Sequence, residues 1–256
     1  MKIIHGTRER DTGWDTTCDD TDIATMPLAA YDIESTGPDP TVARIVQAAI
    51  VVDIPGEEKL IQSWLVYPGC DIPLEASAVH GISTENARDN GIDSIEGIWR
   101  ILNAFQSAKT EYGVRALVAF NSVFDFTILD REMDRNGLGR LSMTDDVGLP
   151  VIDPLICDRK LDTYRSGRRT LTAVSSAYGV VVSQAHQAHG DCVTTLKLAR
   201  AMAVKYPRFR HASLDRLQVL QAEAQAGFAQ QFQEYRRQDD PTFCVRGDWP
   251  ILEKGS

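Results

Sequence analysis

The stretch YDIESTG, residues 31–37, follows the apolar run PLAA and has the character of a strand leaving a buried sheet. Because side chains alternate between the two faces of a strand, Asp32 and Glu34 point to the same side. Two carboxylates among apolar neighbours are costly, since desolvation and mutual repulsion both disfavour their charged forms. A divalent cation removes both costs, whereas an exposed edge strand leaves both groups solvated. Alternation alone favours the edge strand.

The segments around this stretch predict an α/β domain with a mixed sheet. Apolar runs separated by TGPDP and PGEE predict a three-strand antiparallel meander at 27–34, 43–54 and 59–68. Two further buried strands are expected at 115–121 and 150–156, parallel to the first because helices alternate with them. The 3.6-residue periodicity predicts helices at about 93–112, 122–137, 169–179 and 191–207, and residues 69–83 are expected to form a loop.

Three regions follow from the distribution of these patterns. Residues 1–26 are polar and acid-rich, which predicts a flexible N-terminal segment. Residues 27–210 carry the α/β pattern. Residues 211–256 form an extension, in which apolar residues at spacings of three and four predict one long amphipathic helix over 213–237.

The composition limits the classes of function. The 256 residues carry a formal net charge of −9, so a protein that coats duplex nucleic acid is not expected. An acidic enzyme can still act on a polyanion where metal ions screen the contact. The basic start MKIIHGTRER has no apolar stretch, so no signal peptide is expected. The chain has no apolar run long enough for a bilayer and no C-x-x-C pair, so a cytoplasmic protein without membrane contact is expected.

Two further acidic positions precede or begin predicted helices. Asp125 falls early in the helix after AFN, where Ser122-x-x-Asp125 has capping-box spacing, yet Ile128 and Leu129 place it beside the inward stripe. The stretch HQAHGD carries His186 and Asp191 at the start of the last domain helix. An early helical acid and a loop histidine are each common without any function, and His189 lies close by as a competing candidate.

Together these stretches resemble the motifs of the DEDDh family of 3′–5′ exonucleases. YDIESTG is similar to its first motif, FNSVFD to its second and HQAHGD to its third, in order, with AVHGIS similar to a further family segment. The resemblance covers about residues 27–205, and the long last helix with GDWPIL is similar to an actinobacterial-type branch. Phe120 departs from the histidine often found before Asn121. The family is DnaQ-like and includes the epsilon proofreading subunit of bacterial replicative DNA polymerase; it implies a ribonuclease H-like fold.

The resemblance also implies a mechanism. Four carboxylates, Asp32, Glu34, Asp125 and Asp191, would hold two divalent cations, Mg²⁺ or Mn²⁺, with Asp32 shared between them. His186 would be the general base on the attacking water. The reaction would release nucleoside 5′-monophosphates from a 3′ end.

Substrate contacts implied by the resemblance surround these groups. Residues Ser35, Thr36 and Gly37 would lie near the terminal 3′-hydroxyl, and Val79, His80, Asn121 and Phe124 near the last nucleotides. Plain core packing is the alternative for Val79 and Phe124. The basic stretch RKLDTYRSGRRT (159–170) fits either a path for the phosphate backbone or a solvated loop.

Three functions remain open from the sequence. The first is a DNA 3′–5′ exonuclease in repair or proofreading, and the second is a ribonuclease that trims RNA or short oligonucleotides. The third is a subunit that docks a polymerase or repair partner through the C-terminal helix, suggested by Phe228, Phe232 and Tyr235. The simpler expectation for that helix is packing against its own domain.

Overall fold

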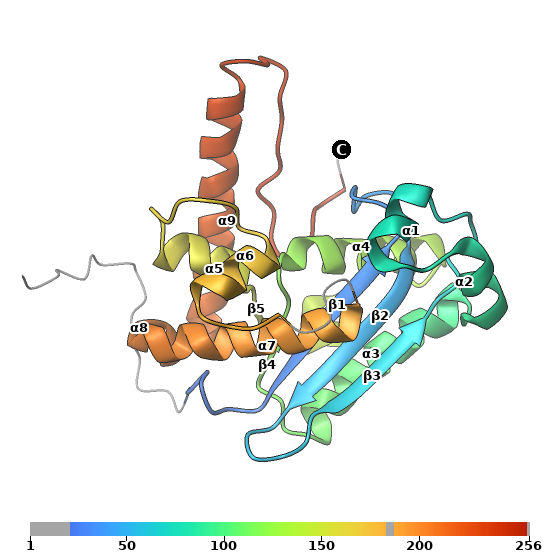
Figure 1. Ribbon diagram of the computed structural model, residues 1–256, viewed down its shortest axis with the longest axis horizontal. Coiled ribbons are helices and arrows are strands. Elements are labelled where there is room, and N and C mark those ends of the chain that lie inside the picture. The colour runs from blue at the N-terminus through green and yellow to red at the C-terminus, as the bar shows by residue number, and fades with distance from the viewer. Residues whose placement is uncertain (1–20, 183–186, 255–256) are drawn as a thin grey trace, which may run out of the picture.

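The fold is a five-stranded mixed sheet covered by helices on both faces (Figure 1). The computed structural model describes residues 21–182 and 187–254. The strand order is β3-β2-β1-β4-β5, in which β2 (Ile45–Asp53) is antiparallel to both of its neighbours, β1 (Leu28–Ser35) and β3 (Leu60–Leu65). Strands β4 (Ala116–Val118) and β5 (Val151–Ile152) run parallel to β1. The predicted ribonuclease H-like mixed sheet is therefore confirmed.

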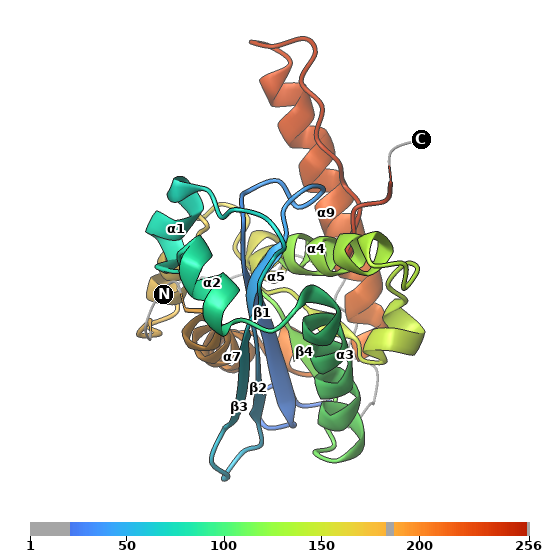
Figure 2. The same ribbon diagram turned by 90° about the vertical axis from the view of Figure 1, so that its right-hand side faces the viewer.

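Each face of the sheet packs against a different set of helices (Figure 2). Helices α3 (Ser94–Thr110) and α4 (Ser122–Arg135) cover one face, where Tyr31 contacts Phe105 and Phe126 edge-on or tilted. Helix α7 (Ala188–Lys205) covers the other face and packs on both β1 and β2. Alternation along β1 explains this division, since odd-numbered residues enter the α3–α4 core and even-numbered ones face α7.

The sequence-based prediction is wrong in two places where the elements are short. The expected loop at 69–83 contains α1 (Leu74–His80), and α2 (Thr84–Asn90) follows it. Each has seven residues, too few for a periodic pattern to stand out. The expected strand at 150–156 ends after Ile152, because Asp153 caps α5 (Pro154–Leu161) with proline in its first turn.

Of the remaining helices, two pack against α7 and one lies in the C-terminal region. They are α6 (Leu171–Ala177), α8 (Pro207–Arg210) and α9 (Leu214–Arg236), and a π-helical turn, η1 (Met143–Val147), precedes β5. Helix α9 confirms the expected long amphipathic helix. None of the helices within the described ranges combines the length and apolarity that a bilayer crossing requires.

The beginning of the described chain is packed against the domain. Ile23 is fully buried, and its N–H donates to the carbonyl of Arg210. Asp22 pairs with the Arg210 guanidinium, which holds the Asp22 pKa at about 2. Residues 21–26 fall within the predicted flexible segment, and the rest of that segment lies outside the described residues.

Helix α9 is anchored by its first half (Figure 1). Leu214, Leu217 and Leu220 enter the core beneath α7, while the second half of α9 projects from the domain. Gln218 donates to the carbonyl of Val151 and accepts from its N–H, so its amide takes the place of a neighbouring strand at the β5 edge. The packing that was expected for this helix is thus present in its first half.

Leu217→Ala is expected to lower the free energy of unfolding by about 2–5 kcal/mol, because Leu217 is completely buried and its truncation leaves a cavity. Val219→Ala, two positions further on and 47% exposed, is the matched control and should change it by less than about 0.5 kcal/mol. Urea denaturation of both variants measures the difference. Equal small effects would show that α9 is not part of the domain core.

Candidate active site

Asp32 and Glu34 lie on the α7 face of the central strand β1. Strand β1 pairs with β2 and β4, so the edge-strand alternative is wrong. Leu28 and Ala30 precede the two carboxylates on this face and are buried, whereas Asp32 and Glu34 are half-buried at its open end. The register shifts between Glu34 and Ser35, which ends the regular pairing beside the two acids.

Asp191 joins them from the first turn of α7. Carboxylate oxygens of Asp32, Glu34 and Asp191 lie within 4.8 Å of one another. The buried thiol of Cys192 contacts the carbonyl of Ala49, and the Ala188 N–H donates to Gln47 of β2 at 3.4 Å. These contacts fix the start of α7 over the sheet, so three acids that are distant in sequence meet at one point.

Asp125 approaches the same place from α4, on the other side of β1. Its Oδ1 accepts a hydrogen bond from the Ile33 N–H at 3.1 Å. Strand β4 pairs with β1 only as far as Ala30, so the Ile33 N–H has no strand partner on that side. The capping-box alternative for Asp125 is wrong, because α4 has Asn121 and not Ser122 as its N-cap and that cap has no side-chain hydrogen bond. The buried Asp125 carboxylate instead binds the strand backbone between Asp32 and Glu34.

A second buried acid, Asp153, holds the turn in front of α4. Asn121 adopts a left-handed conformation, with φ 65°, and its side chain makes no cap. The Asp153 carboxylate instead accepts hydrogen bonds from the N–H groups of Asn121 and Ser122, at 3.1 and 2.8 Å, and from the Ser122 hydroxyl. It also caps α5 through Leu155. Sequence reasoning missed this residue, although Asp before Pro is a helix-start signal.

The electrostatics of the site are those of crowded carboxylates. Burial raises the pKa of Asp32 well above its usual range, and repulsion from Asp125, Asp191 and Glu34 adds to the effect. Burial and then Asp191 raise the pKa of Glu34 to about 7. Burial also raises the pKa of Asp125, against the hydrogen bond from Ile33. Each additional negative charge in this site therefore costs free energy.

The donor set fits a divalent cation. Within the described residues, no Lys, Arg or His forms an ion pair with Asp32 or Glu34, so nothing there neutralises their charges. Clustered carboxylate oxygens are the ligands that hard ions such as Mg²⁺ and Mn²⁺ prefer. Asp32, Glu34 and Asp191 form the group whose oxygens are close enough to share one ion. Asp125 lies outside this group, where its carboxylate accepts from the Ile33 N–H and adds to the repulsion on Asp32.

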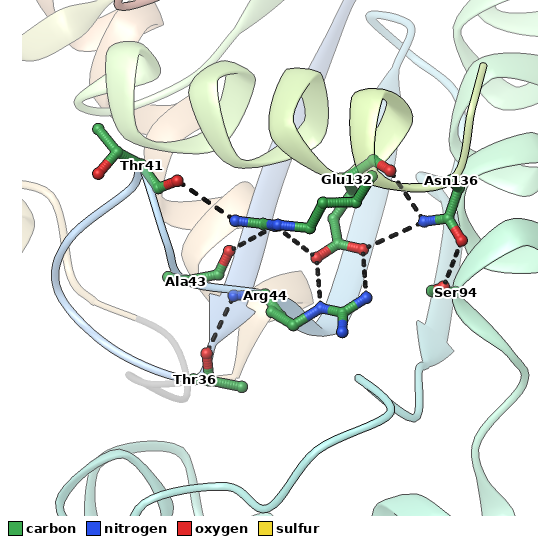
Figure 3. A network of polar contacts seen from close by, with 8 residues as sticks. Thr36, Thr41, Ala43, Arg44, Ser94, Glu132 and Asn136 are labelled. Carbon is green, nitrogen blue, oxygen red and sulfur yellow. Dashed lines mark hydrogen bonds and ion pairs between the residues drawn. The ribbon is translucent and has the colours of Figure 1, made fainter. Parts of the chain in front are cut away.

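The loop after the first motif is tied to α4 (Figure 3). Arg44 donates to both carboxylate oxygens of the buried Glu132, at 2.9 and 3.3 Å, and Arg135 donates to one of them. Thr36 accepts from the Arg44 N–H, while the Ser35 hydroxyl donates to the carbonyl of Gly37. The Ser35 and Thr36 side chains, which are predicted to lie near the 3′ end of the substrate, therefore also stabilise their own loop.

The other predicted substrate residues occupy different environments. Val79 is 56% exposed, so core packing is excluded for it, whereas the half-buried Phe124 packs against the α3–α4 core. His80 is buried; its Nδ1 accepts from the Ile82 N–H, and its Nε2 makes no hydrogen bond with the described residues. Burial lowers the His80 pKa, opposed by the nearby backbone of Ser35. Asn121 is exposed at the start of α4.

The predicted general base and the predicted path for the phosphate backbone remain to be placed. His186 lies outside the described residues, whereas the competing His189 lies half-buried in the first turn of α7. In the basic stretch, Arg165 and Arg169 pair with the buried Asp158. These two arginines therefore hold their own loop in place, and only Lys160 and Arg168 of the predicted phosphate path are exposed.

Comparison with known proteins identifies the family. The protein-family model described as an exonuclease matches residues 29–199, which is more than half of the chain. The chain belongs to this exonuclease family. It therefore carries a DnaQ-like 3′–5′ exonuclease domain of the ribonuclease H-like superfamily, as the motif resemblance implied.

Solved structures with the same fold include exonuclease I of E. coli. Its complex with a dT13 oligonucleotide has a TM-score of 0.60 and 20% identity, covering 72% of this chain and 42% of that chain. An ExoI/SSB-Ct complex has a TM-score of 0.59 and 19% identity, with the same shares covered. This chain thus spans less than half the length of those proteins. No curated protein sequence matches it significantly.

Glu34→Gln is expected to stabilise the metal-free protein at pH 8, because it removes one of the repelling charges. The folded-state pKa of Glu34, about 7, exceeds its ordinary 4.5, so protein stability falls as the pH rises through 7. The gain in melting temperature over wild type should therefore be present at pH 8 and vanish below about pH 4.5. Thermal unfolding in EDTA at several pH values measures it.

Glu58→Gln is the matched control, since Glu58 is exposed in the β2–β3 turn. It should leave the melting temperature nearly unchanged at every pH. A gain for Glu34→Gln of equal size at pH 4.5 and pH 8 would contradict the charge-repulsion account.

Proposed function

We propose that this chain hydrolyses the terminal phosphodiester of DNA from the 3′ end and releases nucleoside 5′-monophosphates. The observation that carries the proposal is the convergence of Asp32, Glu34 and Asp191, from β1 and α7, with oxygens within 4.8 Å. Membership of the exonuclease family supports it. A cytoplasmic location and a role in DNA repair belong to the same proposal.

The four acids have distinct tasks in this proposal. Asp32, Glu34 and Asp191 hold one divalent ion, and Asp125, from the opposite side of β1, helps Asp32 to hold a second. When bound, two ions, Mg²⁺ or Mn²⁺, supply positive charge to the phosphodiester as negative charge builds up during displacement. The Ile33 N–H keeps Asp125 oriented toward the site.

His186 is proposed as the general base. It precedes Asp191 by five residues and lies just before α7, outside the described residues. A neutral imidazole with an ordinary pKa of about 6.5 accepts a proton from water at cellular pH. His189 occupies the first helical turn and is assigned no catalytic task.

Residues around the acids are proposed to bind the 3′ end. Ser35, Thr36 and Gly37 follow the first two carboxylates in the chain, and the buried Nε2 of His80 has no hydrogen-bond partner among the described residues. Exposed Val79 and half-buried Phe124 offer apolar contact to the last bases, with stacking contributing about 1–3 kcal/mol per base. Asn121, exposed at the start of α4, completes this set.

RNA is the alternative substrate, because one such site serves both polymers and the 2′-hydroxyl contact separates them. Similarity to a structure that contains a dT13 oligonucleotide favours DNA. A polymerase or repair partner that docks on α9 stays a prediction. Tyr235 at its projecting end is 63% exposed, whereas Phe232 is covered in part by Phe243 of the following tail.

A gel assay with 5′-labelled DNA and RNA oligonucleotides tests the function. We expect a ladder of products that shorten from the 3′ end, faster on DNA than on RNA, with Mg²⁺ or Mn²⁺ and none in EDTA. Release of the labelled 5′ nucleotide as the first product would contradict the polarity. Faster degradation of RNA would transfer the proposal to the ribonuclease alternative.

Three variants serve as controls in the same assay. Asp191→Asn should abolish the ladder, because it removes a metal ligand from the group of three. His186→Ala should lower the rate by roughly 10²–10⁴, and His189→Ala should change it little. Equal losses for the two histidine variants would mean that the general base is assigned to the wrong residue.

A further inference from the structure

Two separate parts of the C-terminal region support the turn before Asp125, one through Asp153 and the other directly. One part is α9, and the other is the strap, defined here as residues 247–254, which returns from the tip of α9 toward α4 (Figures 1 and 2). Neither part contains any of the predicted site residues. Both nevertheless contact the groups that set the position of α4.

Helix α9 acts through Asp153. The Gln221 side chain is almost fully buried; its Oε1 accepts from the Asp153 N–H at 2.6 Å, and its Nε2 donates to the carbonyl of Val151 at 2.9 Å. Asp153 in turn binds the N–H groups of Asn121 and Ser122. A chain of hydrogen bonds therefore joins α9 to the first residue of α4.

The strap acts on α4 directly. The Trp249 indole N–H donates to the Ser122 hydroxyl at 3.0 Å. The Leu252 N–H donates to the Thr127 hydroxyl at 2.9 Å, and Arg131 donates to the Leu252 carbonyl at 2.7 Å. Lys254 forms an ion pair with Asp134. The strap thus holds α4 from its first residue almost to its last.

The sequence GDWPIL is suited to this path. A Cβ atom at Gly247 would lie 2.9 Å from the Cα of Ala226 and 3.2 Å from the Cβ of Ala229, so only glycine allows the strap this close to α9. Ile251 packs against the α3–α4 core. The strap therefore contacts α9 at Gly247 and the α3–α4 core at Trp249 and Ile251.

Helix α4 lies between the strap and the sheet. Asp125 and Thr127 are two positions apart, which places them about 200° apart around the helix axis. Asp125 accepts from the Ile33 N–H of β1, whereas Thr127 accepts from the strap. Thr127, Arg131 and Asp134 follow at spacings of four and three, so they share the face opposite Asp125. A shift of the strap would therefore change how far Asp125 reaches toward β1.

We propose that Trp249 is a positioning residue for Asp125. By holding Ser122, its indole N–H fixes the first turn of α4, and with it the distance of the Asp125 carboxylate from Asp32 and Glu34. Trp249 itself touches no reacting atom. This inference rests on the proposed function, because Asp125 matters only if it holds a cation. The C-terminal extension then belongs to the catalytic unit.

Trp249→Phe tests the proposal in the full-length chain, since it removes the N–H donor and keeps an aromatic ring. We expect kcat on a DNA oligonucleotide to fall by roughly 10-fold to 100-fold, with KM little changed, because displacement of a catalytic group affects the chemical step. Binding of Mn²⁺ to the protein without DNA, measured by electron paramagnetic resonance, should weaken in parallel. A merely structural role would lower the melting temperature and leave both quantities unchanged.

Trp99→Phe is the matched control, because Trp99 is 50% exposed on α3. It should keep wild-type kcat and Mn²⁺ affinity. Thr127→Val removes the acceptor of the Leu252 N–H with little change of shape, and it should reproduce the Trp249→Phe defect. If Trp249→Phe is unfolded at the assay temperature, Thr127→Val is used in its place.

The outcomes separate this inference from the proposed function. Wild-type kcat and Mn²⁺ affinity in both Trp249→Phe and Thr127→Val, with Asp125→Asn inactive, would overturn the positioning role alone. Full activity of Asp125→Asn would overturn the assignment of Asp125 as a ligand, and the inference with it. Loss of kcat and of Mn²⁺ affinity in Trp249→Phe and Thr127→Val, but not in Trp99→Phe, supports the positioning role of Trp249.

Discussion

Repulsion among carboxylates that are held together is the constraint on which this structure depends. Asp32, Glu34 and Asp191 have oxygens within 4.8 Å, and burial together with neighbouring charge raises the pKa of Asp32 and Glu34. Such an arrangement persists only if the surrounding fold is rigid enough to resist it. The same repulsion makes the site a receptor for divalent cations, since a bound ion turns an unfavourable cluster into a favourable one.

The fold supplies this rigidity from several directions. Strand β1 lies in the middle of the sheet, α7 packs across it, and α4 is fixed at both ends. Glu132 and two arginines tie the far half of α4 to the loop after β1, while Asp153 and Trp249 hold its beginning. The C-terminal region thereby contributes to a site from which it is distant in sequence.

The sequence predicted the parts of this arrangement that local patterns encode. The meander and the long helices have strong periodic signals, and the fold confirmed them. The acidic motifs also have a strong sequence signal, and the structure brings Asp32, Glu34 and Asp191 together. Helices α1 and α2 were missed because seven residues show no clear period. Asp153, Gln221 and Trp249 were missed as supports of α4, because their partners lie 31 to 127 residues away, and such pairings depend on tertiary packing.

Crystallography with Mn²⁺ would show whether the three acids bind a cation, because this ion is located by its anomalous scattering. We expect a strong anomalous peak about 2.1 Å from carboxylate oxygens of Asp32, Glu34 and Asp191. Absence of a peak there, at a Mn²⁺ concentration that supports hydrolysis, would contradict the claim that these acids form the cation site of the enzyme.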